Sequence, residues 1–259
     1  MRDHHSLSLS STYDPDLNAL WARMQSEACG CSDTLIRDLF AVNICDHADF
    51  ASALASLLGT KLTDRAMTEP TLTRLVAESL ADEPAIIFSA AADILATFER
   101  DPACPDLTTP FLFFKGWQAL QAHRIAHHLW HQGRRPLAYH LQSRVNERFG
   151  IDIHPGAQLG RRMSIDHGTG IVIGETTIVE DNVSLFQNVT LGGTGKKKGD
   201  RHPIIRQGAM IGAGAKVLGR LEIGAHARIG AASVVLEDIP PHATAVGNPA
   251  RIIKLTPPE

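Results

Sequence analysis

Two different hydrophobic periods divide this chain of 259 residues near residue 150. Before that point, apolar residues recur at the spacing of an amphipathic helix, i, i+3, i+4 and i+7. The clearest run consists of Ala122, Ile125, Ala126 and Leu129. Arg124, His128 and His131 fall on the opposite side of the same helix. The first part of the chain is therefore predicted to be all-α.

Proline and glycine positions indicate where these helices begin and end. Asp14-Pro15 has the pattern of an N-cap followed by proline at the first helical position, and Thr109-Pro110 repeats it. The second signature predicts a long helix that ends at Gly133. A last helix is expected at about Pro136 to Phe149, and Gly150 is expected to end it.

From residue 151 the apolar residues recur every six positions instead. Fourteen such positions are all Ile, Leu or Val: Ile153, Leu159, Ile165, Ile171, Ile173, Val179, Leu185, Leu191, Ile205, Ile211, Val217, Ile223, Ile229 and Val235. A chain with this period folds as a three-sided coil of roughly eighteen residues, with parallel strands stacking coil on coil. An amphipathic helix would need a period near 3.6, which the sequence does not have here.

Two interruptions break the period of six. The register slips by two residues after Ile171, and a longer break follows Leu191. Residues 192–204, GGTGKKKGDRHPI, are rich in glycine and charge, so we expect a loop that leaves the coil. Its basic run, Lys196 to Lys198, is interpreted as a solvated loop tip rather than a phosphate site.

These patterns predict four segments along the chain. They are a flexible N-terminal tail over 1–13, an α-helical oligomerisation domain over 14–150, a coil domain over 151–246 with its loop at 192–204, and a C-terminal tail over 247–259.

Charge and apolar content narrow the function classes. The 25 Lys and Arg residues nearly cancel the 28 Asp and Glu residues, and aromatic residues are 5% of the chain, which argues against a nucleic-acid-binding surface. No uninterrupted apolar stretch reaches about 18 residues, and the polar N-terminus lacks a secretory signal, so neither a membrane span nor secretion is expected. We expect a cytoplasmic protein whose four cysteines are reduced, partly buried thiols.

Several short strings in both halves resemble serine O-acetyltransferases, members of the hexapeptide-repeat acyltransferase superfamily. In the second half they are DIHP (152–155), DHGTG (166–170), GET (174–176), VTLGGTGK (189–196), GDRHP (199–203), MIGAGAKVLG (210–219) and GNPAR (247–251). In the helical half they are RDPA (100–103), TPFLFFKG (109–116) and HQGRRPLA (131–138). The resemblance implies an α+β fold in which an N-terminal all-α helical domain precedes a left-handed parallel β-helix of hexapeptide repeats.

The resemblance also implies the reaction and the ligands. Acetyl-CoA and L-serine would give O-acetylserine and CoA, the first step of cysteine biosynthesis, by direct transfer and with L-cysteine as a feedback inhibitor. A trimer is expected, with two trimers joined through the helical domain, and no metal cofactor. Many family members end in an isoleucine tail that binds O-acetylserine sulfhydrylase, whereas this sequence ends in TPPE, so we do not expect that complex.

The reaction needs a base, because a serine hydroxyl is a poor nucleophile near neutral pH. His167 in DHGTG is the candidate, since the pKa of an imidazole lies near the working pH. Asp152 in DIHP, fifteen residues earlier, is the candidate partner that orients the ring, because fifteen residues is close to one coil. From spacing alone, a turn aspartate and a surface histidine without function are an equal alternative.

Recognition of serine needs complementary charges. Arg201 in the expected loop is the candidate clamp for the substrate carboxylate, and the neighbouring His202 is a candidate hydrogen-bonding partner of the substrate. The resemblance assigns the ammonium group to Asp166 and Asp101. Asp101 also precedes Pro102, so a helix N-cap is its alternative role.

The resemblance assigns CoA to the side of the later coils. Ala213 and Ala231 resemble positions whose backbone meets the pantetheine arm. Gly193 and Thr194 lie where the thioester is expected, and an amide donor there would stabilise the developing oxyanion. Weaker candidates, for the phosphates, are Arg228 and Lys216.

The sequence also permits other interpretations. The same scaffold would serve an enzyme for another acyl-CoA or acceptor alcohol, or a non-catalytic trimeric scaffold. A zinc enzyme with this fold needs two histidines five residues apart, and the sequence after residue 150 has no such pair. Four histidines crowd one helix at positions 123, 127, 128 and 131, and we interpret them as surface or interface residues rather than a metal site.

Overall fold

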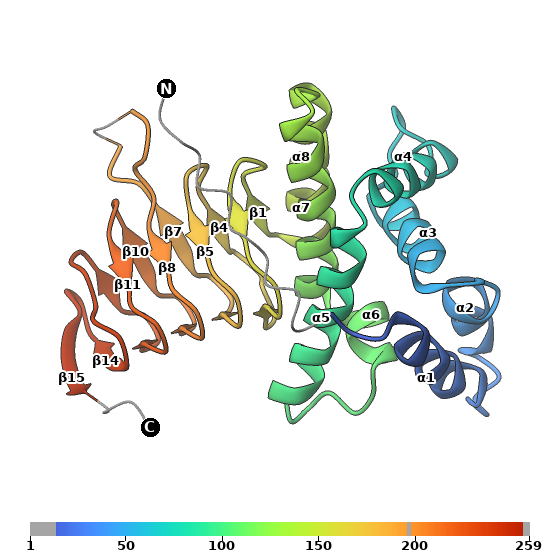
Figure 1. Cartoon of the computed structure of the whole chain (residues 1–259), viewed down its shortest axis with the longest axis horizontal. Coiled ribbons are helices and arrows are strands. Elements are labelled where there is room, and N and C mark those ends of the chain that lie inside the picture. Colours follow the sequence, from blue (N-terminus) through green and yellow to red (C-terminus); the bar gives the residue numbers. More distant parts are fainter. Residues whose placement is uncertain (1–13, 196–197, 256–259) are drawn as a thin grey trace.

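Helices fill the first half of the chain and short strands the second (Figure 1). The computed structural model describes residues 14–195 and 198–255; the predicted tail over 1–13, residues 256–259 and Lys196 and Lys197 of the basic run lie outside the described residues. The helical elements are α1 (Leu17–Cys29), α2 (Arg37–Phe40), the π-helix η2 (Ala41–Cys45), α3 (Phe50–Leu62), α4 (Glu69–Asp82), α5 (Ala85–Arg100), α6 (Thr108–Phe113), α7 (Lys115–His131) and α8 (Arg135–Phe149).

Two of the expected helix boundaries are wrong and one is confirmed. Helix α1 begins after Asp16, whose carboxylate caps two amides of the first turn, so Pro15 precedes the cap instead of following it. The long helix expected up to Gly133 is two helices, because the backbone is extended at Phe114 (φ −89°, ψ 98°) between α6 and α7. Gly150 ends α8 in the left-handed conformation (φ 66°), as predicted.

Within the described residues, the strands build three sheets that form the faces of a prism. Face A has the order β1-β4-β7-β10-β13, face B β11-β8-β5-β2 and face C β15-β14-β12-β9-β6-β3. The strands are β1 (Asp152–Ile153), β2 (Gln158–Leu159), β3 (Ser164–Ile165), β4 (Val172–Ile173), β5 (Ile178–Val179), β6 (Ser184–Leu185), β7 (Thr190–Gly192), β8 (Ile204–Ile205), β9 (Met210–Ile211), β10 (Lys216–Leu218), β11 (Glu222–Ile223), β12 (Arg228–Ile229), β13 (Val234–Val235), β14 (Ala243–Val246) and β15 (Arg251–Leu255). Each strand from β1 to β10 pairs in parallel with the strand three places later, so the chain winds as a β-helix.

The period of six correctly predicts the core of this prism. All fourteen aliphatic positions belong to the coils, and all of them except the half-buried Leu159 are buried. The strand register shows which segments contain the extra residues of the two interruptions. Asp152 pairs with Val172, twenty residues later, because the turn over 166–171 absorbs the slip. Thr190 pairs with Lys216, 26 residues later, because the intervening loop leaves the prism.

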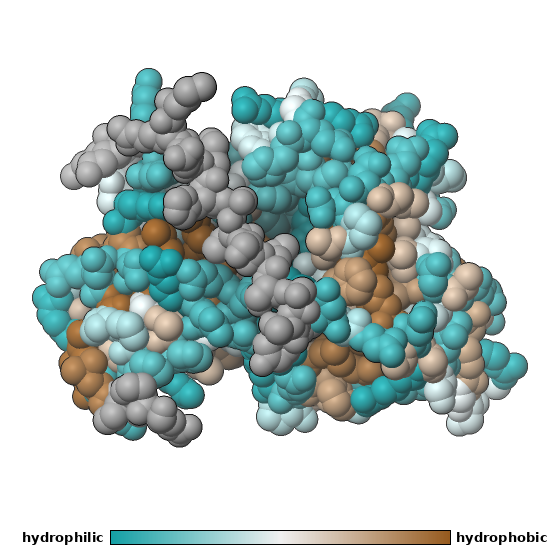
Figure 2. All heavy atoms as spheres, in the orientation of Figure 1, coloured by the Kyte–Doolittle hydropathy of each residue, from teal (hydrophilic) through white to brown (hydrophobic). Residues whose placement is uncertain are grey.

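The segment expected to be a C-terminal tail contains a strand. Residues Arg251–Leu255 form β15, which pairs antiparallel with β14 and widens face C. Ile252, Ile253 and Leu255 are exposed there, at 45%, 64% and 64% of their surface. Figure 2 shows hydrophobic surface at the end of the prism that lies away from the helices, where β15 is placed in Figure 1.

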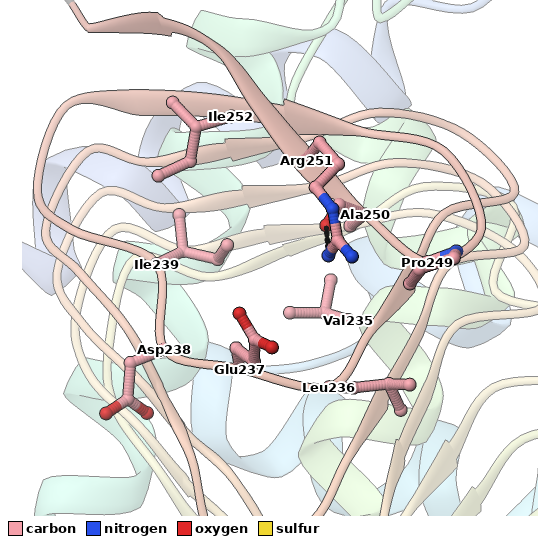
Figure 3. Close-up of a pocket in the computed structure, with 9 residues that line it drawn as sticks. All are labelled: Val235, Leu236, Glu237, Asp238, Ile239, Pro249, Ala250, Arg251 and Ile252. Atoms are coloured by element: carbon pink, nitrogen blue, oxygen red, sulfur yellow. Dashed lines mark hydrogen bonds between the residues drawn. The ribbon is translucent and has the colours of Figure 1, made fainter.

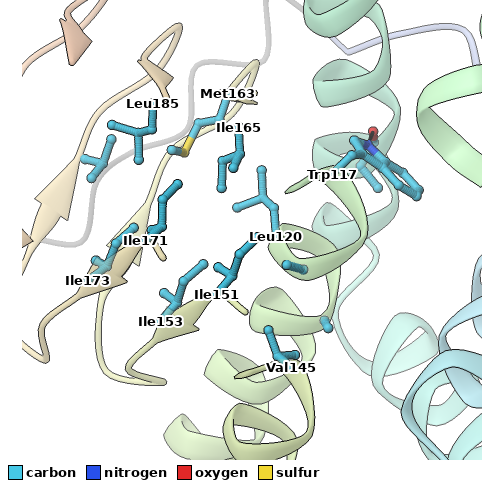
Figure 4. Packing of buried hydrophobic residues seen from close by; sticks show 14 of the residues in the cluster. Trp117, Leu120, Val145, Ile151, Ile153, Met163, Ile165, Ile171, Ile173 and Leu185 are labelled. Atoms are coloured by element: carbon cyan, nitrogen blue, oxygen red, sulfur yellow. Dashed lines mark hydrogen bonds between the residues drawn. The ribbon is translucent and has the colours of Figure 1, made fainter. Parts of the chain in front are cut away.

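Helices α7 and α8 pack on the first coils and form one continuous core with them. Leu120 of α7 lies beside Ile151 and Ile165 of the prism (Figure 4). Trp117 of the same helix points away from the prism, and its Nε1 donates to the Ala90 carbonyl oxygen of α5 (3.1 Å). The helical domain therefore covers the open end of the β-helix and excludes water from it.

A buried ion pair joins the two halves. Asp93 of α5 is fully buried and accepts hydrogen bonds from Arg124 Nη2 (2.7 Å), Gln121 Nε2 (3.1 Å) and the Met163 amide (2.9 Å). Arg124 also donates to the carbonyl oxygen of Gly160 (2.8 Å). The expectation that Arg124 lies on a polar helix face is thus wrong, because its guanidinium is neutralised by Asp93 and satisfied by carbonyl groups of the first coil.

Two of the four histidines of α7, His123 and His127, also lie against the first coil. His123 is 3% exposed, and His127 donates from Nδ1 to the carbonyl oxygen of Pro155 (2.7 Å). Burial lowers the pKa of His123 well below its usual value and lowers the pKa of His127 to about 4. These two residues are consequently neutral packing groups at neutral pH.

The expectation of reduced cysteines is wrong for one pair. Cys29 at the end of α1 and Cys45 at the end of η2 form a disulfide, with their Cα atoms 6.1 Å apart. The pairing depends on how η2 packs against α1, which the sequence spacing does not reveal. Cys31 and Cys104 are free thiols.

No helix among the described residues is both long enough and apolar enough to cross a membrane.

We predict that Asp93→Ala strongly destabilises the fold, because it leaves the buried Arg124 cation without its partner. The expected loss is about 3–5 kcal/mol in the free energy of unfolding, measured by urea denaturation followed by circular dichroism. The matched double variant Asp93→Leu with Arg124→Leu should lose less, since it removes both charges. Equal losses in the two variants would contradict a role for the ion pair.

We predict that the fold loses stability as the pH falls from about 6.5 toward 4. His127 has a lowered pKa in the folded chain, so the unfolded chain binds more protons in this window and protonation favours unfolding. The shift of His127 corresponds to roughly 3 kcal/mol at pH 4. His127→Gln, which retains a donor for Pro155, should flatten the pH dependence of the urea midpoint; an unchanged slope would contradict this assignment.

Candidate functional site

The predicted site residues lie along the two edges that border face A. The turns that lead from face C to face A form what we call the C–A edge, over 166–171, 186–189, 212–215 and 230–233. The turns that lead from face A to face B form the A–B edge, over 154–157, 174–177, 193–203 and 219–221. The stacking of coils brings residues of one edge into line although they are far apart in the sequence.

The C–A edge carries the candidate base and the candidate CoA positions. Asp166 and His167 lie in its first turn, Ala213 in the third and Ala231 in the fourth. The imidazole of His167 is 71% exposed, and its backbone has a left-handed conformation (φ 56°). Within the described residues, the carboxylate within 4 Å of this ring is that of Asp166, whose Oδ1 lies 3.7 Å from Nδ1. That distance is too long for a hydrogen bond.

Asp152 reaches the same edge from the neighbouring coil, on β1. Its amide donates to the carbonyl oxygen of Ile171 (2.9 Å), the last residue of the turn that contains His167. Its carboxylate accepts a hydrogen bond from Gln142 Nε2 of α8 (2.6 Å). The structure therefore brings Asp152 to the expected corner but gives its carboxylate to Gln142 rather than to the His167 ring.

The A–B edge carries the other group of candidates, Gly193, Thr194, Arg201 and His202. They belong to the loop between β7 and β8, which projects from the prism (Figure 1). The two ends of the loop meet at the prism, because a Cβ on Gly193 would lie 3.2 Å from Arg201 Cγ and 3.4 Å from His202 Nε2.

Arg201 is bound to a carboxylate of its own chain. Its Nη2 donates to Glu175 Oε2 (2.8 Å), and this hydrogen bond lowers the pKa of Glu175. The guanidinium is 30% exposed, so it lies at the surface with an acidic partner already in place.

His202 is 7% exposed and has a defined hydrogen-bonding role. The amide of Thr176 donates to its Nδ1 (3.1 Å), so the neutral ring carries its hydrogen on Nε2. Burial lowers the pKa of His202, which favours this neutral form. A Cβ on Gly174 would lie 2.1 Å from Nε2, so the glycine of the GET string makes room for the ring. His202 is thus arranged as a hydrogen-bond donor.

The remaining candidates lie apart from these two groups. Asp101 follows the last residue of α5, and its carboxylate accepts from the Ala103 amide (2.8 Å), so it is not the N-cap of a following helix. Arg228 is exposed on β12 of face C. Lys216 donates from Nζ to the Asn188 carbonyl oxygen (2.6 Å) and to Thr190 Oγ1 (3.0 Å), so its ammonium is occupied within the chain.

Sequence reasoning gave no role to Glu175, Thr176, Lys115 or Gln142, which contact the candidates or their turns. Glu175 and Thr176 belong to the GET string, so the motif itself was a signal for them. Lys115 donates to Thr169 in the turn of His167, and Gln142 donates to Asp152. These two contacts join residues of different domains, and no local pattern predicts them.

Two cavities in the described structure contain none of the candidate residues. One, of about 270 Å³, lies at the outer end of the prism between the turn that follows β13 and the start of β15, where Glu237 and Arg251 point into it (Figure 3). The other, of about 450 Å³, lies between α5, α7 and the first coil and is lined by His123, His127 and Arg124. Across residues 14–195 and 198–255, no group of three or more His, Cys, Asp or Glu residues could hold a metal ion.

Comparison with known proteins identifies relatives of this chain in both of its halves. The family model described as "Serine acetyltransferase, N-terminal" matches residues 20–122, within the helical half. The serine acetyltransferase of Salmonella typhimurium is 49% identical over 240 residues, which cover 92% of this chain and 88% of that protein.

Solved structures extend the similarity to the whole fold. A serine acetyltransferase in complex with cysteine is 45% identical with a TM-score of 0.91, covering 92% of this chain and 94% of that one. The soybean enzyme complexed with serine is 43% identical with a TM-score of 0.90, covering 93% and 100%. The Brucella abortus enzyme in complex with coenzyme A is 41% identical with a TM-score of 0.90, covering 92% and 96%. The predicted fold, a helical domain followed by a left-handed β-helix, is thereby confirmed.

Identity near one half, sustained over nine tenths of the chain and across both domains, leads to one conclusion: this chain belongs to the serine acetyltransferase family.

Proposed function

We propose that this chain transfers the acetyl group of acetyl-CoA to the hydroxyl of L-serine, giving O-acetylserine and CoA in cysteine biosynthesis. The observation that carries the proposal is the family membership of the whole chain, since its relatives are named for this reaction. Acetyl-CoA is the co-substrate, in keeping with a relative whose structure contains coenzyme A. We propose a cytoplasmic location, because the acetyl donor is an intracellular metabolite.

His167 acts as the general base. Its exposed ring on the C–A edge accepts the serine hydroxyl proton as the oxygen attacks the thioester carbonyl carbon. The carbonyl π electrons move to the oxygen, then return as the C–S bond breaks, and the imidazolium gives its proton to the departing thiolate. Asp152 and Asp166 stabilise the imidazolium from the same edge.

The carboxylate and the hydroxyl of serine are recognised from the A–B edge. Arg201 exchanges Glu175 for the substrate carboxylate, and His202 offers its Nε2 hydrogen to the substrate. Asp166 and Asp101 receive the ammonium group. L-cysteine has the same ammonium and carboxylate groups, so it competes for this site as an inhibitor, in keeping with a relative solved in complex with cysteine.

CoA lies along the C–A edge, next to His167. Ala213 and Ala231 follow His167 along this edge, and their small side chains leave backbone groups accessible to the pantetheine arm. Gly193 and Thr194 supply the amide that stabilises the developing oxyanion, and Arg228 faces the phosphates.

The two edges of one chain lie on opposite sides of face A, so the site needs two chains. Face A presents Val172, 42% exposed, beside the bordering edges. If three copies turn face A toward a threefold axis, the C–A edge of each meets the A–B edge of the next, and the ring closes. We therefore propose a trimer of this kind, with two trimers joined through the helical domain.

We predict that His167→Ala lowers kcat for CoA release from acetyl-CoA and L-serine by about 10²–10⁴-fold, because the hydroxyl loses its base. Binding of CoA, measured by calorimetry, should persist. The unmodified chain should prefer acetyl-CoA to succinyl-CoA and serine to homoserine. A variant that keeps full turnover would contradict the role of His167, and a chain that releases no CoA would contradict the proposed reaction.

We predict that two inactive variants restore activity when their subunits are mixed. His167→Ala removes the C–A contribution and Arg201→Ala the A–B contribution, so mixed trimers contain intact sites at some boundaries. Refolding or co-expression at equal amounts should restore about a quarter of the sites. Each variant refolded or expressed alone under the same conditions is the control. Failure of the mixture to gain activity would show that both residues serve one site from the same chain.

A further inference from the structure

We propose that Lys115 and Gly116, the first two residues of α7, are positioning residues that hold the turn carrying His167. The inference rests on the proposed function, because it gives the helical domain a part in placing the base of that reaction. It concerns the turn over 166–171, which is longer than the four-residue turns at 186–189, 212–215 and 230–233 of the same edge.

The backbone of this turn adopts conformations that contacts from other segments must hold in place. His167, Gly168 and Gly170 all have left-handed conformations, with φ of 56°, 77° and 77°. A residue with a Cβ pays a conformational cost there, and His167 is such a residue. A conformation of this kind persists only where the surroundings fix it.

Gly116 fixes the turn on its N-terminal side. A Cβ at this position would lie 2.1 Å from the carbonyl oxygen of Ile165 and 2.8 Å from Ile165 Cγ2. The backbone of α7 therefore touches the peptide that directly precedes Asp166, and only glycine permits this approach.

Lys115 fixes the turn on the other side. Its Nζ donates a hydrogen bond to Thr169 Oγ1. The residue can reach Thr169 because α7 starts anew after the extended residue Phe114. Contacts at Ile165 and Thr169 thus bracket Asp166 and His167 from one helix end.

The end of α8 completes the support. The Gly170 amide donates to the Gly150 carbonyl oxygen (2.7 Å), and a Cβ on Gly168 would lie 2.5 Å from Ile151 Cδ1. The base is therefore placed by contacts from two helices, in addition to the stacking of the coils. A displacement of the ring by about 1 Å is enough to lower a rate as much as 100-fold.

The test compares Gly116→Ala and Lys115→Met with matched controls. Both variants should lower kcat by roughly tenfold or more, with KM for acetyl-CoA unchanged, since Ala213 and Ala231 lie on later coils. Lys115→Arg, which keeps a cationic donor, should recover most of the loss. Gly59→Ala creates a similar overlap, 2.1 Å to Thr73 Oγ1 between α3 and α4, and should leave kcat unchanged. Lys61→Met is the control for loss of a lysine.

A second readout does not depend on activity. Amide hydrogen exchange in the peptide over 165–172 should speed up in Gly116→Ala and Lys115→Met but not in the two controls. Unchanged exchange in that peptide, or an equal fall of kcat in Gly59→Ala, would overturn the positioning role. If Gly116→Ala fails to fold, Lys115→Met decides by the same criteria. If exchange responds as expected while the unmodified chain releases no CoA, the proposed function fails and the contact between helix and turn stands.

Discussion

Parallel hydrogen bonding between successive coils sets the positions of the turns that carry the candidate residues. Each strand pairs with the strand one coil later, so turns that are distant in the sequence align along straight edges. His167, Ala213 and Ala231 share an edge for this reason, although they are far apart in the sequence. The aliphatic side chains of the period of six fix the register, because a slip would turn them out of the core. The geometry of the candidate site is therefore a consequence of core packing.

The helical domain ends the β-helix and also holds its first coil. Asp93 and Arg124 bind the backbone of this coil through Met163 and Gly160. Buried charges of this kind contribute little to net stability compared with apolar packing, but they are intolerant of displacement because each group needs its partner. They connect the placement of the first coil, and with it the first turn of the C–A edge, to the placement of α5 and α7.

The sequence predicts repetition well and cross-domain contacts poorly. The period of six predicts the inward aliphatic positions, and its break after Leu191 predicts the projecting loop. The motifs and their spacing predict His167 at a corner of the coil, and Arg201 and His202 in the projecting loop. The hydrogen-bonding partners of the site residues are harder to predict from the sequence. Tertiary packing brings the Glu175 carboxylate to Arg201 and the Gln142 amide to Asp152.

Contacts between separate helices also explain why Arg124 and two of the cysteines differ from the prediction. Arg124 was expected on a polar face, yet a buried carboxylate from another helix makes the interior its more favourable place. Cys29 and Cys45 were expected as thiols, yet the approach of η2 to α1 joins them. The sequence pattern of one helix does not reveal which residues of other helices pack against it, and those residues determine burial and pairing.

The proposed function requires one imidazole on the C–A edge of a subunit to meet substrate held by the A–B edge of the next subunit. The most direct measurement is a crystal structure of this protein with L-serine and CoA bound together. The account predicts the serine hydroxyl within hydrogen-bonding distance of the His167 ring, with the substrate carboxylate on Arg201 of the neighbouring subunit. Serine bound away from that ring, or held by both residues of a single chain, would contradict it.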